Sequence, residues 1–432
     1  MTLQLAYYGD DFTGSTDALE SLTVAGLRTA LFLSPPTPAQ LARYADLQAV
    51  GVAGLSRSLA PAAMEAELRP AFAALRALGP RHVHYKICST FDSSPAVGSI
   101  GRAIDVGVEV FGGRYVPLLV GAPALGRHCV FGNLFARMGI GSSGEIYRLD
   151  RHPSMIHHPV TPADEGDLRL HLAKQTAKRI ALFDILKVAL PESEARAALD
   201  KIVADGGEIV LFDVLYSEQL NRLGALIDTA ARPGSPFFSV GSSGIGMALG
   251  AHWAEQGRMT PKNSWPNPGE AKPLLVVSGS CSPVTGGQIA WAQANGFAMI
   301  ALDPTSPDVV GAATKTIAEL KSGRNTVVYT SRGEAGALVP ASSLGTALGQ
   351  VALAAVKRAG LRRLLVAGGD TSSYAGRALG IEALEMIAPL APGAPLCRVH
   401  AAGSPVDGLE INFKGGQVGA PDYFGAVASG KI

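Results

Sequence analysis

Short apolar runs alternate with longer segments of helical periodicity along most of the chain. Each run is rich in Val, Ile, Leu or aromatic residues and ends near Gly, Ser, Thr or Asp, which is typical of buried strands. Strands that alternate with helices predict parallel sheets. In the first part of the chain we predict strands at Leu3–Tyr8, Thr29–Leu33, Ala49–Ala53, Val83–Ile87, Pro117–Val120, Arg179–Phe183, Glu208–Asp213 and Pro236–Val240.

Helical periodicity is clearest in Ala60–Leu78 and Pro191–Asp205, where Ala and Leu recur at helical spacing and a Gly follows. Another helical pattern begins at Ala18. Between Gly126 and Arg151 the periodicity weakens into aromatic and Gly-rich segments, and we predict a hairpin insertion there.

Residues 256–272 are polar, contain three prolines and show no periodicity, so we predict a linker. The segments 1–255 and 273–432 are then two α/β domains, each a mainly parallel sheet flanked by helices. Small-molecule sites commonly form between domains, so we expect the active site in the interdomain cleft. In the second domain we predict strands at Leu274–Ser278, Met299–Asp303, Thr326–Thr330, Leu364–Ala367 and Leu396–Val399, and helices from Val284, Thr314, Leu344 and Ser373.

Composition narrows the classes of function. Lys and Arg number 37 against 36 Asp and Glu, and this net charge of +1 supplies no basic field for nucleic acid or a membrane surface. Four cysteines without a CxxC pair favour a reduced, cytoplasmic protein. No apolar run reaches the roughly 18 residues of a membrane span. A mean hydropathy of +0.22 with 17% charged residues predicts a homodimer, because apolar surface is left to cover.

The segment Gly9–Asp17 (GDDFTGSTD) follows the first predicted strand and holds three carboxylates and three hydroxyls. In parallel sheets, ligands bind where strand ends meet helix N-termini. We therefore predict that Asp10 and Asp11 bind substrate and serve in catalysis. The alternative is an ordinary helix start, capped by Asp17 or Thr16.

Two cations follow other strands at the same expected edge. Arg57 comes after the third strand, where a guanidinium could hold a carboxylate through two hydrogen bonds or simply lie solvated on the surface. Lys86 lies within an apolar run, where burial is costly without an anionic partner. Three polar residues that follow it, Ser89, Thr90 and Asp92, complete the predicted substrate site.

The turn Val240–Gly246 follows a strand and opens a helix, but it is not the GxSxG of a hydrolase. A dinucleotide site would need an acidic residue about 20 positions further on at a strand end, and the linker lies there instead. We interpret the turn as an anion-binding turn. The adjacent His157 and His158 would point to opposite faces of a strand, so the sequence does not favour a metal-binding site there.

Three Gly-rich or Ser-rich turns follow strands of the second domain. Glycines allow the backbone to come close to a ligand, and hydroxyls follow them at a helix N-terminus. This combination favours a phosphate site. The chain lacks GxxxxGK[ST], so a nucleotide would bind without a P-loop. The predicted nucleotide-binding residues are Ser280, Ser282, Gly368, Gly369, Asp370, Thr371 and Gly416.

Over nearly its whole length the chain resembles the four-carbon acid sugar kinase family. The motifs that carry the resemblance are, in order, GDDFTGSTD, SRS, YKICSTFDSS, HHPVTPADEGDL, SGSCSPVT, GGDTSS and INFKGGQVGAPDYF. The resemblance implies an ATP-dependent kinase that phosphorylates a terminal hydroxyl of threonate, erythronate, 3-oxo-tetronate or a branched relative such as 3-oxo-isoapionate. It assigns the acid to the N-terminal domain and ATP to the C-terminal domain.

The resemblance also implies roles for individual residues. Asp10, Asp11, Arg57 and Lys86 match the acid-binding motifs, and Ser280, the 368–371 turn and Gly416 match the ATP-binding motifs. The chain departs from the commoner Lys-Ile-Asp-Ser-Thr-Leu-Arg-Gly pattern, since it reads KICSTFDS from Lys86. This departure touches the substrate pocket and leaves the identity of the acid open.

Phosphoryl transfer requires Mg²⁺, cations over the transferred oxygens and a group that orients the attacking hydroxyl. We expect Asp11 in that last role, with Asp10 or Asp17 in support. Arg57 would hold the substrate carboxylate, and Lys86 would balance either substrate or phosphoryl charge. The sequence assigns no Mg²⁺ ligands. An NAD-dependent hydroxy-acid dehydrogenase and a non-catalytic acid-sugar sensor remain the alternatives.

Overall fold

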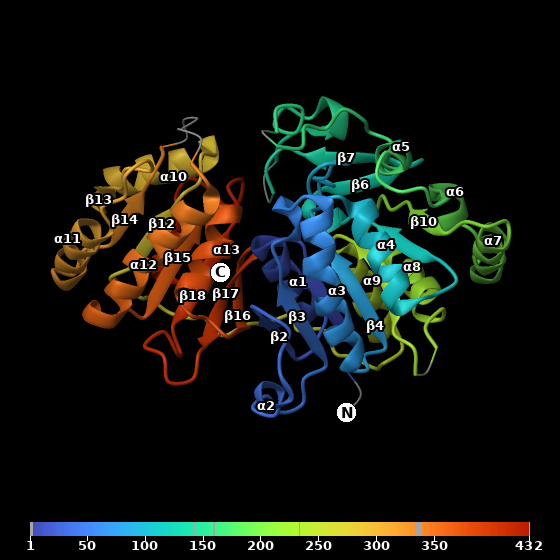
Figure 1. The fold of residues 1–432 in the computed structure, drawn as a ribbon, viewed down its shortest axis with the longest axis horizontal. Helices are drawn as coiled ribbons and strands as arrows, with labels where there is room; N and C mark the ends of the chain where they lie inside the picture. The colour runs from blue at the N-terminus through green and yellow to red at the C-terminus, as the bar shows by residue number, and fades with distance from the viewer. Residues whose placement is uncertain (1–2, 141–142, 159, 233, 333–338, 432) are drawn as a thin grey trace. The chain divides into compact units, whose positions relative to one another are not determined.

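The computed structural model describes residues 3–140, 143–158, 160–232, 234–332 and 339–431 (Figure 1). Its internal contacts divide the chain into two units. The first unit extends to Asn263, except for Ala30–Leu33 and residues 139–141, which group with the second unit. The second unit otherwise begins at Ser264.

The first unit is built on a parallel sheet whose described strands run in the order β3-β1-β4-β11-β5-β10-β9. All seven were predicted from the sequence to within a few residues. Their bounds are β1 Leu5–Gly9, β3 Ala49–Ala53, β4 His82–Lys86, β5 Val116–Leu119, β9 Ile180–Phe183, β10 Ile209–Phe212 and β11 Phe237–Gly241.

The helices of the first unit connect these strands, and two of them were predicted almost to the residue. They are α1 Phe12–Val24, α2 Pro38–Leu41, α3 Pro61–Ala77, α4 Ile100–Phe111, α5 Leu168–Ala173, α6 Ile185–Val188, α7 Glu192–Ala204, α8 Gln219–Asp228 and α9 Gly244–Glu255. The expected hairpin insertion is confirmed as an antiparallel sheet of β6 Arg127–Val130, β7 Asn133–Arg137 and β8 Ile146–Arg148.

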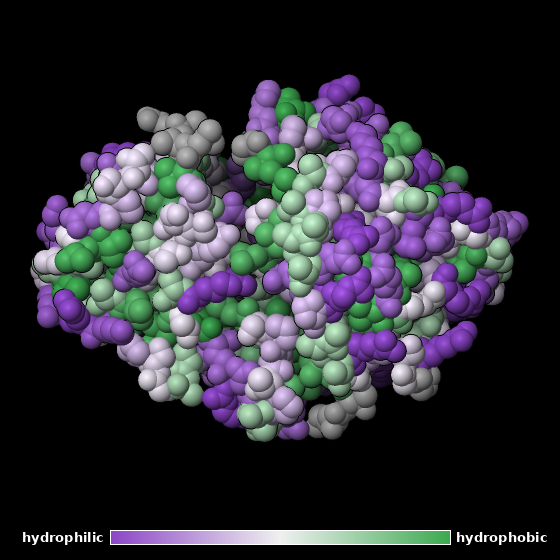
Figure 2. Space-filling view, viewed as in Figure 1, coloured by the Kyte–Doolittle hydropathy of each residue, from purple (hydrophilic) through white to green (hydrophobic). Residues whose placement is uncertain are grey.

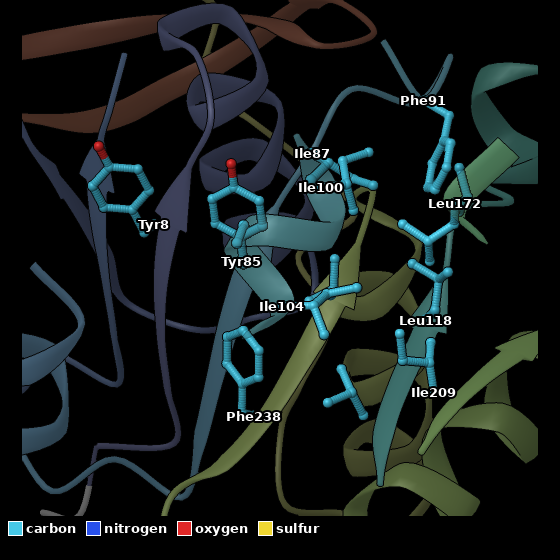
Figure 3. Packing of buried hydrophobic residues seen from close by; sticks show 14 of the residues in the cluster. Tyr8, Tyr85, Ile87, Phe91, Ile100, Ile104, Leu118, Leu172, Ile209 and Phe238 are labelled. Carbon is cyan, nitrogen blue, oxygen red and sulfur yellow. The ribbon is translucent and has the colours of Figure 1, made fainter. Parts of the chain in front are cut away.

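The core of the first unit packs α3 and α4 against the central strands. Tyr8 and Tyr85, from neighbouring strands, stack with ring centroids 6.2 Å apart, and Phe238 extends the same cluster (Figure 3). Hydrophilic and weakly hydrophobic residues both lie on the exposed side of α3 and α4 (Figure 2), and on these helices Arg69 pairs with Glu65 and with Glu109 at 2.6 Å. Each helix therefore carries one apolar and one charged face, as its sequence periodicity indicates.

The start of α1 differs from the predicted helix at Ala18. The helix begins at Phe12, and Asp11 is its N-cap, because its side chain accepts a hydrogen bond from the Gly14 amide. Neither Asp17 nor Thr16 caps the helix, so that alternative is wrong. The hydroxyls of the motif are consequently part of the first turns of α1.

The second unit contains a mixed sheet with described strands in the order β13-β14-β12-β15-β18-β17-β16. Strands β12 to β15 and β18 are parallel, while β17 and β16 are antiparallel, and Leu31 and Phe32 of β2 (Thr29–Phe32) pair with β16. The bounds are β12 Leu275–Ser278, β13 Ala298–Ala301, β14 Thr326–Tyr329, β15 Arg363–Ala367, β16 Ala383–Ala391, β17 Ala394–His400 and β18 Glu410–Lys414.

Strands β16 and β18 were not among the predicted strands. Two register shifts and Pro389 interrupt the alternation of β16, so its sequence lacks a strand pattern. The helices of this unit are α10 Pro283–Ala294, α11 Val309–Lys321, α12 Ala341–Ala359, α13 Gly369–Ala378 and α14 Tyr423–Ser429. Three predicted helix starts are late by three to five residues (Val309, Ala341 and Gly369 against Thr314, Leu344 and Ser373), and α13 therefore includes the predicted turn from Gly369.

Candidate active site

Register in the first sheet aligns the strand ends that carry the predicted substrate site. Gly9 of β1 lies opposite Ala53 of β3 and Lys86 of β4, and Lys86 also lies opposite Gly241 of β11. Since the strands are parallel, the segments after them emerge at one edge. This edge gathers Asp10, Asp11, Arg57 and Lys86, as predicted.

Asp11 is held by several donors. Its Oδ1 accepts the Gly14 amide at 2.7 Å, and its Oδ2 accepts the Thr13 hydroxyl at 2.7 Å. The Arg57 guanidinium lies 2.6 Å from the same Oδ2. Burial opposes ionisation, but Arg57 and the Thr13 hydrogen bond outweigh it and lower the pKa of Asp11. Asp11 is thus a fixed carboxylate with both oxygens engaged.

The neighbouring Asp10 is in a different electrostatic state. Its side chain is buried, Oδ2 accepts the Cys88 amide at 3.3 Å, and Oδ1 has no hydrogen-bond partner among the described residues. Burial raises the pKa of Asp10 to about 7, against the opposing charge of Arg57. Two adjacent carboxyl groups whose pKa values are separated in this way are typical of acid–base sites.

Lys86 has the anionic partner that its sequence position required. Its ammonium lies 3.2 Å from Oδ2 of Asp17 and donates to the Ile87 carbonyl at 3.0 Å. Ser243, from the turn after β11, donates to the same Asp17 oxygen. Burial would lower the pKa of Lys86, but Asp17 and Asp10 outweigh burial and raise it. The side chain is therefore a buried, charged ammonium.

The polar residues after β4 form a short hydrogen-bonded chain. Thr90 Oγ1 lies 3.0 Å from the Cys88 sulfur and donates to Asp92 Oδ1 at 2.7 Å. Burial raises the pKa of the Cys88 thiol to about 12, so the thiol is protonated at neutral pH. Ser89 is buried in the same segment.

Arg127 of β6 belongs to this neighbourhood and was not predicted. Burial lowers the pKa of Arg127, and the carboxylates of Asp92 and Asp17 act against this effect. Its Nη1 donates to the Leu125 and Arg137 carbonyls, while Nε has no partner among the described residues. The hairpin that carries Arg127 brings it there, and no local sequence pattern signals that approach.

The predicted nucleotide residues of the second unit also converge. At Gly416, a side chain would place its Cβ 3.0 Å from Ser280 Oγ and 2.9 Å from Ser282 Cβ. At Gly368, which has φ +117°, the corresponding Cβ would lie 2.9 Å from Thr371 Oγ1 and 3.3 Å from the Ser280 amide. Three separate turns therefore meet in one place that only glycine allows.

Other predicted residues of this site differ in position. Gly369 and Asp370 form the first turn of α13, and the Asp370 side chain is exposed. The sequence places Ser278, Thr285 and the cation Lys414 in these turns, but sequence reasoning assigned no role to their side chains. Both Ser278 and Ser282 have hydroxyls without a partner among the described residues, and Lys414 donates to Thr285 Oγ1 at 2.9 Å.

Within the described ranges, no helix has both the length and the apolarity to cross a membrane. The same ranges contain no group of three or more His, Cys, Asp or Glu side chains that could hold a metal ion.

Comparison with known proteins assigns the two units to two family models. Residues 5–249 match a sugar-binding N-terminal domain, and residues 275–424 match a nucleotide-binding C-terminal domain. The chain is 44% identical to a 3-oxo-isoapionate kinase of Paraburkholderia graminis, over 100% of this chain and 95% of that protein. It is 34% identical to a 3-oxo-tetronate kinase of Methylobacterium radiotolerans, over 98% of each.

Solved structures share the fold. A protein of Salmonella typhimurium LT2 superposes with a TM-score of 0.77 at 23% identity, over 98% of both chains. A Haemophilus influenzae protein superposes with a TM-score of 0.70 at 22% identity, over 99% of both. The two family models and the full-length relatives place the chain in the four-carbon acid sugar kinase family.

Proposed function

We propose that this kinase transfers the γ-phosphate of ATP to a terminal hydroxyl of a small acid sugar, and that a branched 3-oxo acid such as 3-oxo-isoapionate is the substrate. The observation that carries the proposal is the buried Asp10 carboxyl, which has one oxygen without a partner among the described residues and lies beside the Arg57 and Lys86 cations. Such a site can bind an acid and accept a hydroxyl proton. The 44% identity to a 3-oxo-isoapionate kinase supports the choice of substrate.

The experiment is an ADP-release assay with ATP, Mg²⁺ and a panel of acids. The panel contains threonate, erythronate, 3-oxo-tetronate and 3-oxo-isoapionate. We expect the highest kcat/KM for the branched 3-oxo acid. Binding of these acids without ADP release would instead support the acid-sugar sensor, and a greater kcat/KM for an unbranched acid would refute the substrate assignment.

The contacts favour Asp10 over Asp11 as the group that accepts the hydroxyl proton. Asp11 has both oxygens engaged and a lowered pKa, whereas Asp10 has one oxygen without a partner among the described residues and a pKa raised to about 7. A general base is most effective with such a pKa. In this assignment Asp11 fixes Arg57, and Lys86 balances the charge of substrate or transferred phosphoryl group.

Replacing Arg57 with Ala should weaken acid binding by about 1.5–3 kcal/mol, because a charge-assisted pair is lost from a partly desolvated site. The loss should largely vanish for a neutral four-carbon polyol, which has no carboxylate. Calorimetric Kd values for acid and polyol check this. The Ser58→Ala variant, at an exposed neighbouring position, should bind both as the wild type does. Equal weakening for acid and polyol would exclude the carboxylate role.

We propose that ATP binds where the turns at Ser280, Gly368 and Gly416 meet. Backbone amides at such turns, together with the N-termini of α10 and α13, suit phosphate oxygens. Mg²⁺ coordinates oxygen and commonly stays bound to phosphate and water, so it would arrive with the nucleotide and neutralise phosphate charge.

The Gly416→Ala variant tests the nucleotide site. Its Cβ would press on Ser282 and Ser280, so the KM for ATP should rise by about tenfold or more, while the Kd of the acid changes little. The matched Gly415→Ala variant should be nearly silent, because its Cβ would meet only Val418 Cγ2 at 3.6 Å. Steady-state kinetics with each substrate varied in turn would measure both effects. Equal losses for ATP and the acid in a folded Gly416→Ala protein would contradict the assignment.

We also propose that the protein acts in the cytoplasm as a homodimer. Its low charged fraction and reduced cysteines support this proposal. Light scattering at micromolar concentration should give about twice the chain mass of 44.6 kDa, and a mass equal to that of one chain would refute the dimer.

A further inference from the structure

Lys414, the last residue of β18, is a fully buried cation close to the proposed nucleotide site. Its side chain is 0% exposed, and Nζ donates to Thr285 Oγ1 in the first turn of α10 at 2.9 Å. Thr285 Oγ1 in turn donates to the Gly416 carbonyl at 2.9 Å. One hydroxyl therefore separates the Lys414 ammonium from the glycine turn that approaches Ser280 and Ser282.

Two other cations of the described chain, Lys86 and Arg363, are as deeply buried as Lys414, and each has a carboxylate partner. Lys86 lies 3.2 Å from Asp17, and Arg363 lies 2.6 Å from Glu410. Lys414 forms no ion pair with any described carboxylate, and burial lowers its pKa to about 7. A buried charge without a partner is costly, so a group in this position releases its proton readily.

Among the described residues, the elements packed around Lys414 place no paired carboxylate beside it. The first turn of α13 carries Asp370, and the loop before α10 carries Cys281, but both side chains are exposed. On α14 the Tyr423 hydroxyl donates to Asn412 and carries no charge. On β15 the residue paired with Lys414 is the apolar Ala367. Burial lowers the pKa of Lys414, and no charged group among the described residues opposes this effect. An anion bound at the turns would therefore be its nearest negative charge.

We propose that Lys414 is the internal counter-charge of the nucleotide phosphates, and that it takes up a proton from solvent when the nucleotide binds. The proton moves from buffer to Nζ, and no covalent bond to the nucleotide forms. Thr285 Oγ1 accepts a hydrogen bond from the Lys414 ammonium and donates one to the Gly416 carbonyl. Lys414 therefore acts on the Gly416 turn through Thr285 and is a positioning residue. The inference rests on the proposed nucleotide site in this unit.

Isothermal titration calorimetry with MgADP tests the inference on the full-length protein. At about pH 8, the binding enthalpy is measured in two buffers that differ in ionisation enthalpy, such as HEPES and Tris. The dependence on buffer gives the number of protons taken up. We expect nearly one proton at about pH 8 and much less at about pH 6, where Lys414 is already protonated.

Variants assign the proton to its residue. The Lys414→Met protein should bind MgADP about tenfold more weakly and take up no proton at this group. Cys281→Ser removes the thiol of the loop before α10, and Lys431→Met repeats the Lys-to-Met change at an exposed position. Both controls should keep the uptake seen in the wild type. Uptake that persists in folded Lys414→Met would overturn the inference.

The wild-type protein alone also decides the question if Lys414→Met does not fold. Binding that takes up a proton weakens as pH rises, so the Kd for MgADP should increase by about tenfold or more between about pH 7 and pH 9. MgADP binding with no dependence on buffer or pH would refute the role of Lys414 and leave the nucleotide site intact. The absence of any MgADP binding would instead refute the proposed function.

Discussion

Replacing Asp10 with Asn should lower kcat by about 10²-fold to 10⁴-fold, because the variant keeps the shape of the side chain but cannot accept the hydroxyl proton. The Cys88 amide can still donate to the Asn oxygen, so the folded structure should persist. Substrate Kd should change by much less than kcat. Single-turnover kinetics, together with calorimetric binding of the acid, measures the two quantities separately.

The pH dependence of the rate should differ between the wild type and Asp10→Asn. Burial raises the pKa of Asp10 to about 7, and only the ionised carboxylate can accept a proton. The wild-type rate should therefore rise as pH increases through about 7, and this rise should be absent from Asp10→Asn. If the Kd of the acid stays unchanged over this pH range, the rise of the rate does not come from tighter substrate binding.

Asp11→Asn is the matched comparison. Asn can still cap α1 through its side-chain oxygen, but the ion pair with Arg57 is lost. We expect a larger effect on acid KM than on kcat, and a retained rise of rate with pH. If Asp11→Asn abolishes turnover while Asp10→Asn remains active, the two aspartates have the opposite roles.

Replacing Asp228 with Ala should reduce the free energy of unfolding by about 3–5 kcal/mol, because it leaves buried donors without their acceptor. Asp228 ends α8 and is 4% exposed. It accepts Arg81 Nε at 2.9 Å, His82 Nε2 at 2.9 Å and Trp253 Nε1 at 3.0 Å. Denaturant unfolding at neutral pH measures the loss. Asp200→Ala, where the removed carboxylate is exposed, should change stability by less than about 0.5 kcal/mol.

The contacts of Asp228 also determine how its contribution to stability changes with pH. Burial opposes ionisation of Asp228, but the hydrogen bonds from His82, Arg81 and Trp253 outweigh it and lower the pKa. The stabilisation is therefore complete above the unfolded pKa of about 3.9 and is lost as pH falls towards the folded pKa. The difference between wild type and Asp228→Ala should shrink below about pH 4. A difference that stays constant to lower pH would show that the cavity, and not the charge, destabilises the variant.

Much of the fold follows from local sequence pattern. All seven parallel strands of the first sheet coincide with apolar runs, because a strand covered by helices on both faces must be apolar at nearly every position. The long helices α3 and α7 show the same correspondence with helical periodicity. Sequence pattern fails to predict β16, where two register shifts and Pro389 interrupt the alternation that identifies a strand.

Some residues of the candidate site could also be predicted from the sequence, and others could not. Asp10, Asp11, Arg57 and Lys86 were predictable, because each follows or ends a parallel strand and strand ends share one edge. Arg127 was not, because it reaches this edge through a hairpin whose path depends on packing. Lys414 stood in a recognisable turn, but its lack of a carboxylate partner depends on every element around it.

The sequence by itself determined the parallel strands of the first sheet, the residue types at their ends and the family. Those properties depend on neighbours in the chain, which a sequence displays directly. Only the tertiary structure decided that Asp11 caps α1 and pairs with Arg57 while Asp10 keeps an unpartnered oxygen and a raised pKa. Adjacent identical residues differ here because burial and charge depend on distances between side chains from separate strands and turns, and the folded chain alone fixes those distances.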